Sequence, residues 1–348
     1  MNHCKIPENN TTVFSKNMSC IIKGVAILMM IAHHCFAFPD YWLEPFSVSY
    51  FIANLCNQFK LCVAVFAFIT GYGFHVSKNT SFLQLIRKVM NFLAQYWFQL
   101  FLIFLPVASI GFSFSLKQIL YNIFALYDNI IIFAWYVFFH CVVILTFPVV
   151  KRLLTKGPVW DLFIVLIGGY CVTVLFYFWP FDGSIFAMLL DCSIYYPVVG
   201  IGYLAARYAV FEQLSCKIKY KFPIALLLIV IIFSVRSHIS VVKGFTFDVF
   251  YAPALILALS WILTKFPLIC SGLDFLGKNS LHMWLFHAIF FSAYTRDVIQ
   301  PLVAWSNSAI VRFLLITILS TVFAFAINCL WKWLIQILHR NKEKHSCT

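Results

Sequence analysis

The chain has 348 residues, of which 63% are hydrophobic and only 11% are charged. Soluble domains are roughly 45–50% apolar and about 25% charged, so this composition excludes an ordinary soluble protein and indicates a chain surrounded by lipid. The formal net charge of +13 does not indicate nucleic-acid binding, because Lys and Arg gather in the cytoplasmic loops of membrane proteins. We therefore expect membrane lipids, and no nucleic acid, as partners.

The sequence begins with a polar segment, residues 1–18, followed by a series of apolar runs. The first run is followed by no small-residue cleavage site, so a cleaved signal peptide is not expected. A membrane-spanning helix needs about 20 mostly apolar residues. About ten segments meet this requirement, and they predict an all-α polytopic membrane protein with spans at 19–38, 51–74, 92–112, 130–150, 162–181, 185–207, 222–242, 247–265, 280–295 and 309–335.

Between the third and fourth spans, the stretch 116–129 is predicted to form an interfacial helix. The expected organisation is a cytoplasmic segment 1–18, one membrane domain 19–338 and a basic cytoplasmic tail 339–348. We see no internal repeat and no second domain.

The distribution of Lys and Arg predicts the orientation. If the N-terminus is cytoplasmic, 19 of the 25 basic residues fall on the cytoplasmic side. Lys60 lies within a span, and only five fall on the other side: Lys117, Arg236, Lys243, Arg296 and Arg312. Positively charged loops stay inside, so both termini are predicted to be cytoplasmic, in a multi-pass protein of the cell membrane.

The twelve cysteines include no Cys-x-x-Cys pair, and most lie within apolar runs. This pattern is typical of small buried apolar residues and does not indicate a disulfide framework or a metal site. We therefore expect no bound metal.

Ionisable residues at membrane depth are costly and mark functional sites by default. Six residues within the predicted spans are candidates on this ground: His33, His34, Lys60, His140, Asp191 and His287. With a rise of about 1.5 Å per residue, His34 falls in the outer half of the membrane and His287 near the middle. We expect these groups to share a cavity that opens outward. For His140 and His287, a simple hydrogen bond to nearby backbone stays open as an alternative.

The first predicted helix has an informative phase. Lys23 and His34 are eleven residues apart and lie on one stripe with Met30 between them, whereas His33 points about 100° away. The small residues Gly24 and Ala26 favour the close approach of a neighbouring helix.

Four motifs carry a resemblance to a known family. They are the run KGVAILMMIAHH from Lys23 to His34, the run FAFITGYGF from Phe66 to Phe74, the pair Trp135-Tyr136, and LGKNSLHMWLFH from Leu276 to His287. In this order, over about ten spans, they resemble the acyltransferase type 3 family of integral membrane O-acyltransferases. The chain departs from the family pattern in having Lys23 for Arg, Thr70 for Ser, and Arg87-Lys88 in place of Arg-x-x-Arg.

The resemblance implies an enzyme that moves an acyl group, most often acetyl, from acyl-CoA to a hydroxyl of a cell-surface or lipid-linked carbohydrate. His34 takes the place of the family's essential histidine and is expected to act as general base, with His33 secondary. Asp191 is expected to orient an imidazole or to bind a sugar hydroxyl.

The remaining candidate residues have supporting roles. Lys60, Tyr136 and His287 are candidate donors to the developing oxyanion, and Trp135 and His140 complete the expected substrate site. Lys23, Arg87 and Lys88 are expected to attract the phosphates of acetyl-CoA, although positive-inside topology alone also explains the two loop residues.

An alternative from another functional class is a secondary transporter in which the same His and Asp side chains form a relay. Transporters commonly contain internal repeats, and none is evident here. A non-catalytic scaffold leaves the intramembrane ionisable residues unexplained.

Overall fold

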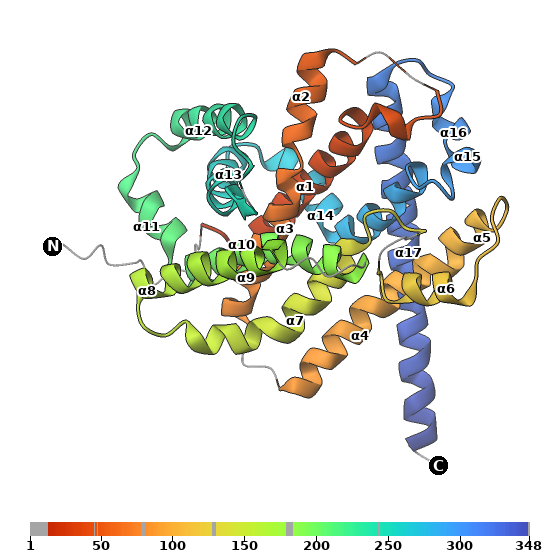
Figure 1. The fold of residues 1–348 in the computed structure, drawn as a ribbon, viewed down its shortest axis with the longest axis horizontal. Helices are drawn as coiled ribbons and strands as arrows, with labels where there is room; N and C mark the ends of the chain where they lie inside the picture. The colour runs from red at the N-terminus through yellow and green to blue at the C-terminus, as the bar shows by residue number, and fades with distance from the viewer. Residues whose placement is uncertain are drawn as a thin grey trace.

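The structure is a computed structural model, and it describes residues 13–44, 46, 48–77, 81–126, 130–178, 184–242 and 244–346. Within these residues the chain is almost entirely helical (Figure 1). The first half contains α1 (Lys16–Phe36), η1 (Pro39–Tyr41), α2 (Tyr50–Gln58), α3 (Leu61–Val76), α4 (Phe82–Gln99), the π-turn η2 (Leu100–Phe104), α5 (Leu105–Ala108), α6 (Leu116–Ile123) and α7 (Trp135–Leu153).

The second half continues in the same way, with one small β-hairpin between two helices. Its elements are α8 (Pro158–Phe163), the π-turn η3 (Ile164–Gly168), α9 (Gly169–Phe178), α10 (Ser184–Arg207), α11 (Val210–Lys217), α12 (Lys221–Arg236), β1 (Val241–Val242), β2 (Phe245–Thr246), α13 (Asp248–Leu263), α14 (Pro267–His287), η4 (Ala288–Phe290), α15 (Arg296–Ile299), α16 (Pro301–Ala304) and α17 (Ala309–Ser346). The two strands pair antiparallel.

The prediction of an α-helical, polytopic membrane protein agrees with this architecture. In the described part of the chain, seven helical segments are long and apolar enough to cross a bilayer, or eight if one bent pair counts as a single span. Large apolar side chains on their outer faces are exposed, for example Phe178, Leu227 and Trp333, as expected where lipid covers the surface. The expected number of ten spans and the orientation of the termini stay predictions.

Each of the ten predicted segments contains helix, but several bounds differ. The third begins earlier, at Phe82, because a capping box formed by Ser81 and Gln84 starts the helix there. The seventh is bent by 120° against α11 and ends at Arg236, where the chain turns into the hairpin. The ninth begins at Pro267, and the tenth extends through the predicted tail to Ser346.

Other predictions of local structure can be compared directly. The stretch predicted to form an interfacial helix does contain a helix, α6, although residues 127–129 lie outside the described part. The second predicted span is divided into α2 and α3, because the helical hydrogen-bond pattern is interrupted at Phe59 and Lys60.

Two pairs of helices approach each other at glycines. A Cβ atom on Gly24 of α1 would overlap the Leu273 carbonyl oxygen of α14, and one on Gly277 of α14 would overlap the Cys20 carbonyl oxygen of α1. The same reciprocal arrangement joins α3 and α10 through Gly71 and Gly202. Small residues allow such close packing of transmembrane helices. The sequence-based expectation for Gly24 is therefore confirmed, and α1 and α14 cross at the centre of the molecule (Figure 1).

Candidate active site

The contact between α1 and α14 brings together two histidines that are far apart in the sequence. The Nδ1 atom of His34 lies 2.9 Å from the Nε2 atom of His287, and both side chains are buried. His287 is the last residue of α14, and His34 lies in the last turn of α1. The reciprocal contacts of Gly24 and Gly277 join the same two helices, so they fix how the helix ends that carry the two histidines lie relative to each other.

The surroundings of the pair indicate which nitrogen carries the proton. The Nε2 atom of His287 lies against His34, its Nδ1 atom is buried without a hydrogen bond of acceptable geometry, and the backbone carbonyls of Met283 and Trp284 lie close to the ring. Carbonyl oxygens only accept, so a proton is favoured on this Nδ1 atom. The Nε2 atom of His287 then accepts from Nδ1–H of His34, which leaves a lone pair on Nε2 of His34.

Phe133 covers the histidine pair. Its ring stacks on His34 with a centroid distance of 3.7 Å and an interplanar angle of 8°, and it lies nearly parallel to His287 at 5.8 Å. The backbone of Phe133 has φ +75°, a left-handed conformation that is strained for a bulky residue. Strain of this kind persists where the surroundings over-determine it, often at functional sites.

His33 has a different partner. Its Nδ1 atom lies 2.9 Å from the Cys56 carbonyl oxygen at the end of α2. Because this oxygen accepts, the Nδ1 atom of His33 donates, and the imidazole is fixed in one tautomer when neutral. The rings of His33 and His34 are 5.2 Å apart, so His33 is a neighbour of the pair without joining its hydrogen bond.

Two cavities meet beside His34. The first, about 140 Å³, is lined by His33, His34, Phe38, Lys60, Cys62, Val63, Phe133 and Trp135, and the second, about 320 Å³, is lined by Lys23, Phe66, Ile69, Thr70, Gly73, Phe92, His140, Ser280 and Leu281. Met30, Tyr136 and Trp284 line both. The stripe of Lys23, Met30 and His34 that helix phase predicts therefore faces this pair of cavities.

Most predicted site residues gather around these cavities. Lys60, Trp135 and Tyr136 line the His34 cavity, and Lys23 and His140 line the other. The Tyr136 hydroxyl is buried and makes no hydrogen bond of acceptable geometry, although Thr70 lies near it.

Three predicted residues lie elsewhere. Asp191 on α10 is exposed, and no hydrogen bond joins it to either imidazole in the described structure. Lys60 does act electrostatically on its carboxylate. Arg87 and Lys88 are exposed on the first turns of α4 and line neither cavity.

Sequence reasoning missed several contributors. Phe133, Trp284 and Phe38 form walls of the site, but in the sequence they are three aromatic residues among many. The sequence offers one signal for two of them: Trp284 lies within the motif from Leu276 to His287, and Phe133 lies just before the pair Trp135-Tyr136. Arg236 and Arg312 were counted only as charges on the outer side. Both are buried: Arg236 pairs with Asp248, and Arg312 donates to three carbonyl groups.

The described side chains contain no cluster of three or more His, Cys, Asp or Glu residues arranged for a metal ion. The arrangement around His34 instead offers an imidazole that is hydrogen-bonded through Nδ1 and lines a cavity, an arrangement that suits a general base. An ammonium group at Lys60 and a phenol at Tyr136 are available as donors nearby.

Comparison with known proteins agrees with this chemistry. Residues 21–329 match the model of a family described as an acyltransferase domain, the acyltransferase type 3 family. No curated protein and no solved structure matches the chain. The matched region includes most of α1, both cavities and the His34–His287 pair, and it covers nearly the whole chain. The chain belongs to the acyltransferase type 3 family of membrane acyltransferases.

Proposed function

We propose that this acyltransferase moves an acetyl group from acetyl-CoA to a hydroxyl of a cell-surface or lipid-linked carbohydrate, in the cell membrane. The observation that carries the proposal is the hydrogen bond from His34 to His287 beside two adjoining cavities. One cavity serves each substrate, and the reacting atoms meet at their shared wall.

His34 is the general base. Its Nε2 atom removes the proton of the acceptor hydroxyl while the hydroxyl oxygen attacks the thioester carbonyl carbon. The C–S bond of the tetrahedral intermediate then breaks, the acyl–oxygen ester bond remains, and the imidazolium of His34 returns the proton to the departing CoA thiolate. By accepting Nδ1–H, His287 fixes the orientation of the His34 ring and stabilises the positive charge that forms on it, a role like that of the third member of a catalytic triad.

The negative charge that develops on the carbonyl oxygen requires fixed donors. Lys60 lines the same cavity as His34, and Tyr136 lines both cavities, its buried hydroxyl making no hydrogen bond of acceptable geometry to the nearby Thr70. A buried hydroxyl left unpaired is costly, so a substrate oxygen that accepts from Tyr136 supplies the missing partner. We assign Lys60 and Tyr136 to the oxyanion and Trp135 to contacts with the acceptor.

The donor enters from the Lys23 end of α1. The larger of the two cavities is lined by Lys23 and, about two helical turns further along α1, by Met30, which it shares with the His34 cavity together with Tyr136 and Trp284. Its apolar lining suits an extended thioester arm, while Lys23 suits an anionic group at its mouth. His140 lines this route. Arg87 and Lys88 lie outside it, and their part is limited to attraction of the CoA phosphates.

The acceptor enters from the opposite end, through the cavity that carries Lys60. With both termini cytoplasmic, this end faces outward, in agreement with an acceptor on the cell surface and a donor in the cytoplasm. Asp191 is exposed on α10 and subject to the charge of Lys60, so we assign it to an acceptor hydroxyl and no longer to an imidazole.

The test is acyl transfer from labelled acetyl-CoA to surface glycans in membranes that carry the protein. General-base loss costs about 10²–10⁴-fold in rate, so His34→Ala should abolish detectable transfer. His33→Ala is the matched control, because His33 lies beside His34 but bonds to a backbone carbonyl, and a measurable fraction of activity should survive. Both variants should accumulate normally.

Loss of activity in the His33 variant, with activity kept in the His34 variant, would show that His33 is the general base. Absence of acyl transfer by wild-type membranes, together with a His34-dependent substrate gradient, would favour the transporter alternative instead.

A further inference from the structure

The break between α2 and α3 lies directly beside the catalytic histidines. Across it, four backbone N–H groups bond to the carbonyl three residues earlier: Phe59 to Cys56, Lys60 to Asn57, Cys62 to Phe59 and Val63 to Lys60. A tight turn thus replaces the α-helical pattern. As a result, no described backbone N–H group donates to the Gln58 carbonyl, and a buried carbonyl without a donor is costly.

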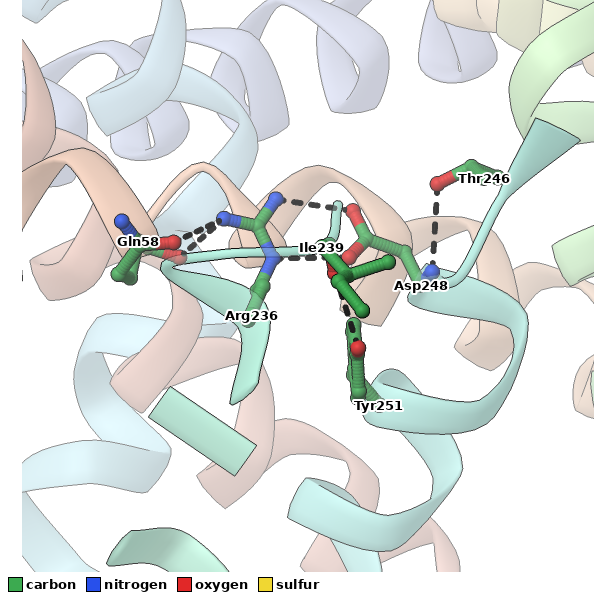
Figure 2. A network of polar contacts seen from close by, with 6 residues as sticks. All are labelled: Gln58, Arg236, Ile239, Thr246, Asp248 and Tyr251. Atoms are coloured by element: carbon green, nitrogen blue, oxygen red, sulfur yellow. Dashed lines mark hydrogen bonds and ion pairs between the residues drawn. The ribbon is translucent and has the colours of Figure 1, made fainter. Parts of the chain in front are cut away.

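Arg236 supplies the missing donor. Its Nη1 atom donates to both the backbone carbonyl and the side-chain Oε1 of Gln58, each at 3.1 Å. Its Nε and Nη2 atoms donate to the two carboxylate oxygens of Asp248 at 2.8 and 3.0 Å. Figure 2 shows the guanidinium lying between Gln58 and Asp248, with every partner on a different element.

Further hydrogen bonds fix the connection that carries the Arg236–Asp248 ion pair. Arg236 ends α12 and Asp248 begins α13, so the pair closes the connection that contains the β-hairpin. The Asp248 N–H donates to Thr246 Oγ1 at 3.2 Å, and the Tyr251 hydroxyl donates to the Ile239 carbonyl at 2.9 Å (Figure 2). The guanidinium therefore has little freedom to follow a movement of α2.

Stability alone is a weak reason for such a pair. Arg236 is 5% exposed and Asp248 is 1% exposed, and replacing a buried ion pair by apolar residues of similar size is often neutral or stabilising. A guanidinium, however, presents donors in a fixed planar fork. The guanidinium can donate to the Asp248 carboxylate from one edge and to the Gln58 carbonyl from another at the same time, whereas a pair of apolar side chains can donate to neither.

The break held by Arg236 carries two parts of the active site. Cys56, two residues before Gln58, accepts the hydrogen bond from His33, and Lys60, two residues after it, lines the cavity of His34. We propose that Arg236 and Asp248 are positioning residues, which hold the α2–α3 break so that Lys60 and the Cys56 carbonyl face the histidines. This inference rests on the proposed function and deepens it.

The decisive variant is the double substitution Arg236→Met/Asp248→Leu, which removes both charges and leaves neither buried alone. The matched control is Arg207→Met/Asp161→Leu. Arg207 and Asp161 also form an ion pair between two helices, and Arg207 also donates to a carbonyl, that of Leu154, but none of the three lines the site cavities. Each protein is purified in detergent and assayed for kcat and KM with acetyl-CoA and an acceptor glycan.

A second readout does not depend on catalysis. The amine of Lys60 is labelled with an N-hydroxysuccinimide ester and quantified by mass spectrometry against Lys117, an exposed lysine on α6. Displacement of the break should change the Lys60 labelling rate several-fold. Misplacement of a catalytic group by about 1 Å can cost on the order of 10²-fold in rate, so kcat should fall by that order with KM for acetyl-CoA little changed.

The proposal is supported if both variants accumulate but only the Arg236→Met/Asp248→Leu variant loses kcat and changes its Lys60 labelling. The control variant should keep wild-type values of both. Wild-type kcat in an accumulating double variant would overturn it. If the double variant fails to accumulate, Arg236→Lys takes its place, since it keeps the charge but loses the fork, and full activity there would overturn the proposal. If the wild type transfers no acyl group, the proposed function fails, and unchanged Lys60 labelling then refutes the positioning role separately.

Discussion

Gly277 of α14 packs so closely against α1 that any β-carbon would overlap the carbonyl oxygen of Cys20. The obstacle is backbone, which cannot move aside as a flexible side chain would. The contact is matched by Gly24 against Leu273. The two glycines thus set the distance between the helices that carry His34 and His287.

Gly277→Ala should therefore separate α1 from α14 and weaken the histidine pair. We expect a lower thermal unfolding midpoint in detergent and a loss of acyl transfer in membranes. Gly272→Ala on the same helix is the control, because no atom lies within 4 Å of a Cβ atom built there. It should be neutral or slightly stabilising, since Ala favours helix over Gly by about 1 kcal/mol. Equal behaviour of the two variants would contradict this view of the interface.

Phe133 is predicted to combine a functional ring with a strained backbone. Its φ of +75° is readily adopted by Gly but costs roughly 1–2 kcal/mol for other residues. Phe133→Gly and Phe133→Ala both remove the ring stacked on His34, so both should lower kcat. The Gly variant should unfold at a higher temperature than the Ala variant, as measured by thermal denaturation in detergent. The reverse order of stability would show that the backbone at this position is relaxed.

Asp191→Asn tests the assignment of this carboxylate to the acceptor. The amide keeps the size and hydrogen-bonding atoms of the side chain but removes its charge and part of its accepting capacity. We expect a raised KM for the acceptor, an unchanged KM for acetyl-CoA and normal accumulation in the membrane. The measurement is steady-state kinetics with each substrate varied in turn. Unchanged kinetics for both substrates would remove Asp191 from the site.

The orientation rests on the asymmetry of basic residues and has a direct test. Reporter fusions after Lys156, Lys265 and Lys344 should all report the cytoplasm, whereas a fusion after Ser306 should report the outside. An external signal at two of the first three positions would invert the assignment of the two cavities to donor and acceptor, while leaving the His34–His287 geometry as it is.

Local properties of the sequence were sufficient to predict the helical membrane architecture and the first-helix stripe. Apolar length and composition determine which segments enter the bilayer, and the helical repeat places Lys23, Met30 and His34 on one face. These features depend only on neighbours along the chain. The family motifs add the order of the site elements, from Lys23 to His287.

Tertiary structure alone decided the partners of these residues. His34 and His287 are 253 positions apart, and nothing in either local sequence specifies that one imidazole bonds the other while His33 bonds a carbonyl. Arg236 was counted among the basic residues on the outer side, but it is buried against Asp248 and Gln58. A charged side chain has the same letter in the sequence whether it is solvated or paired, and only the packing of distant helices, which removes water and supplies a partner, determines which of the two occurs.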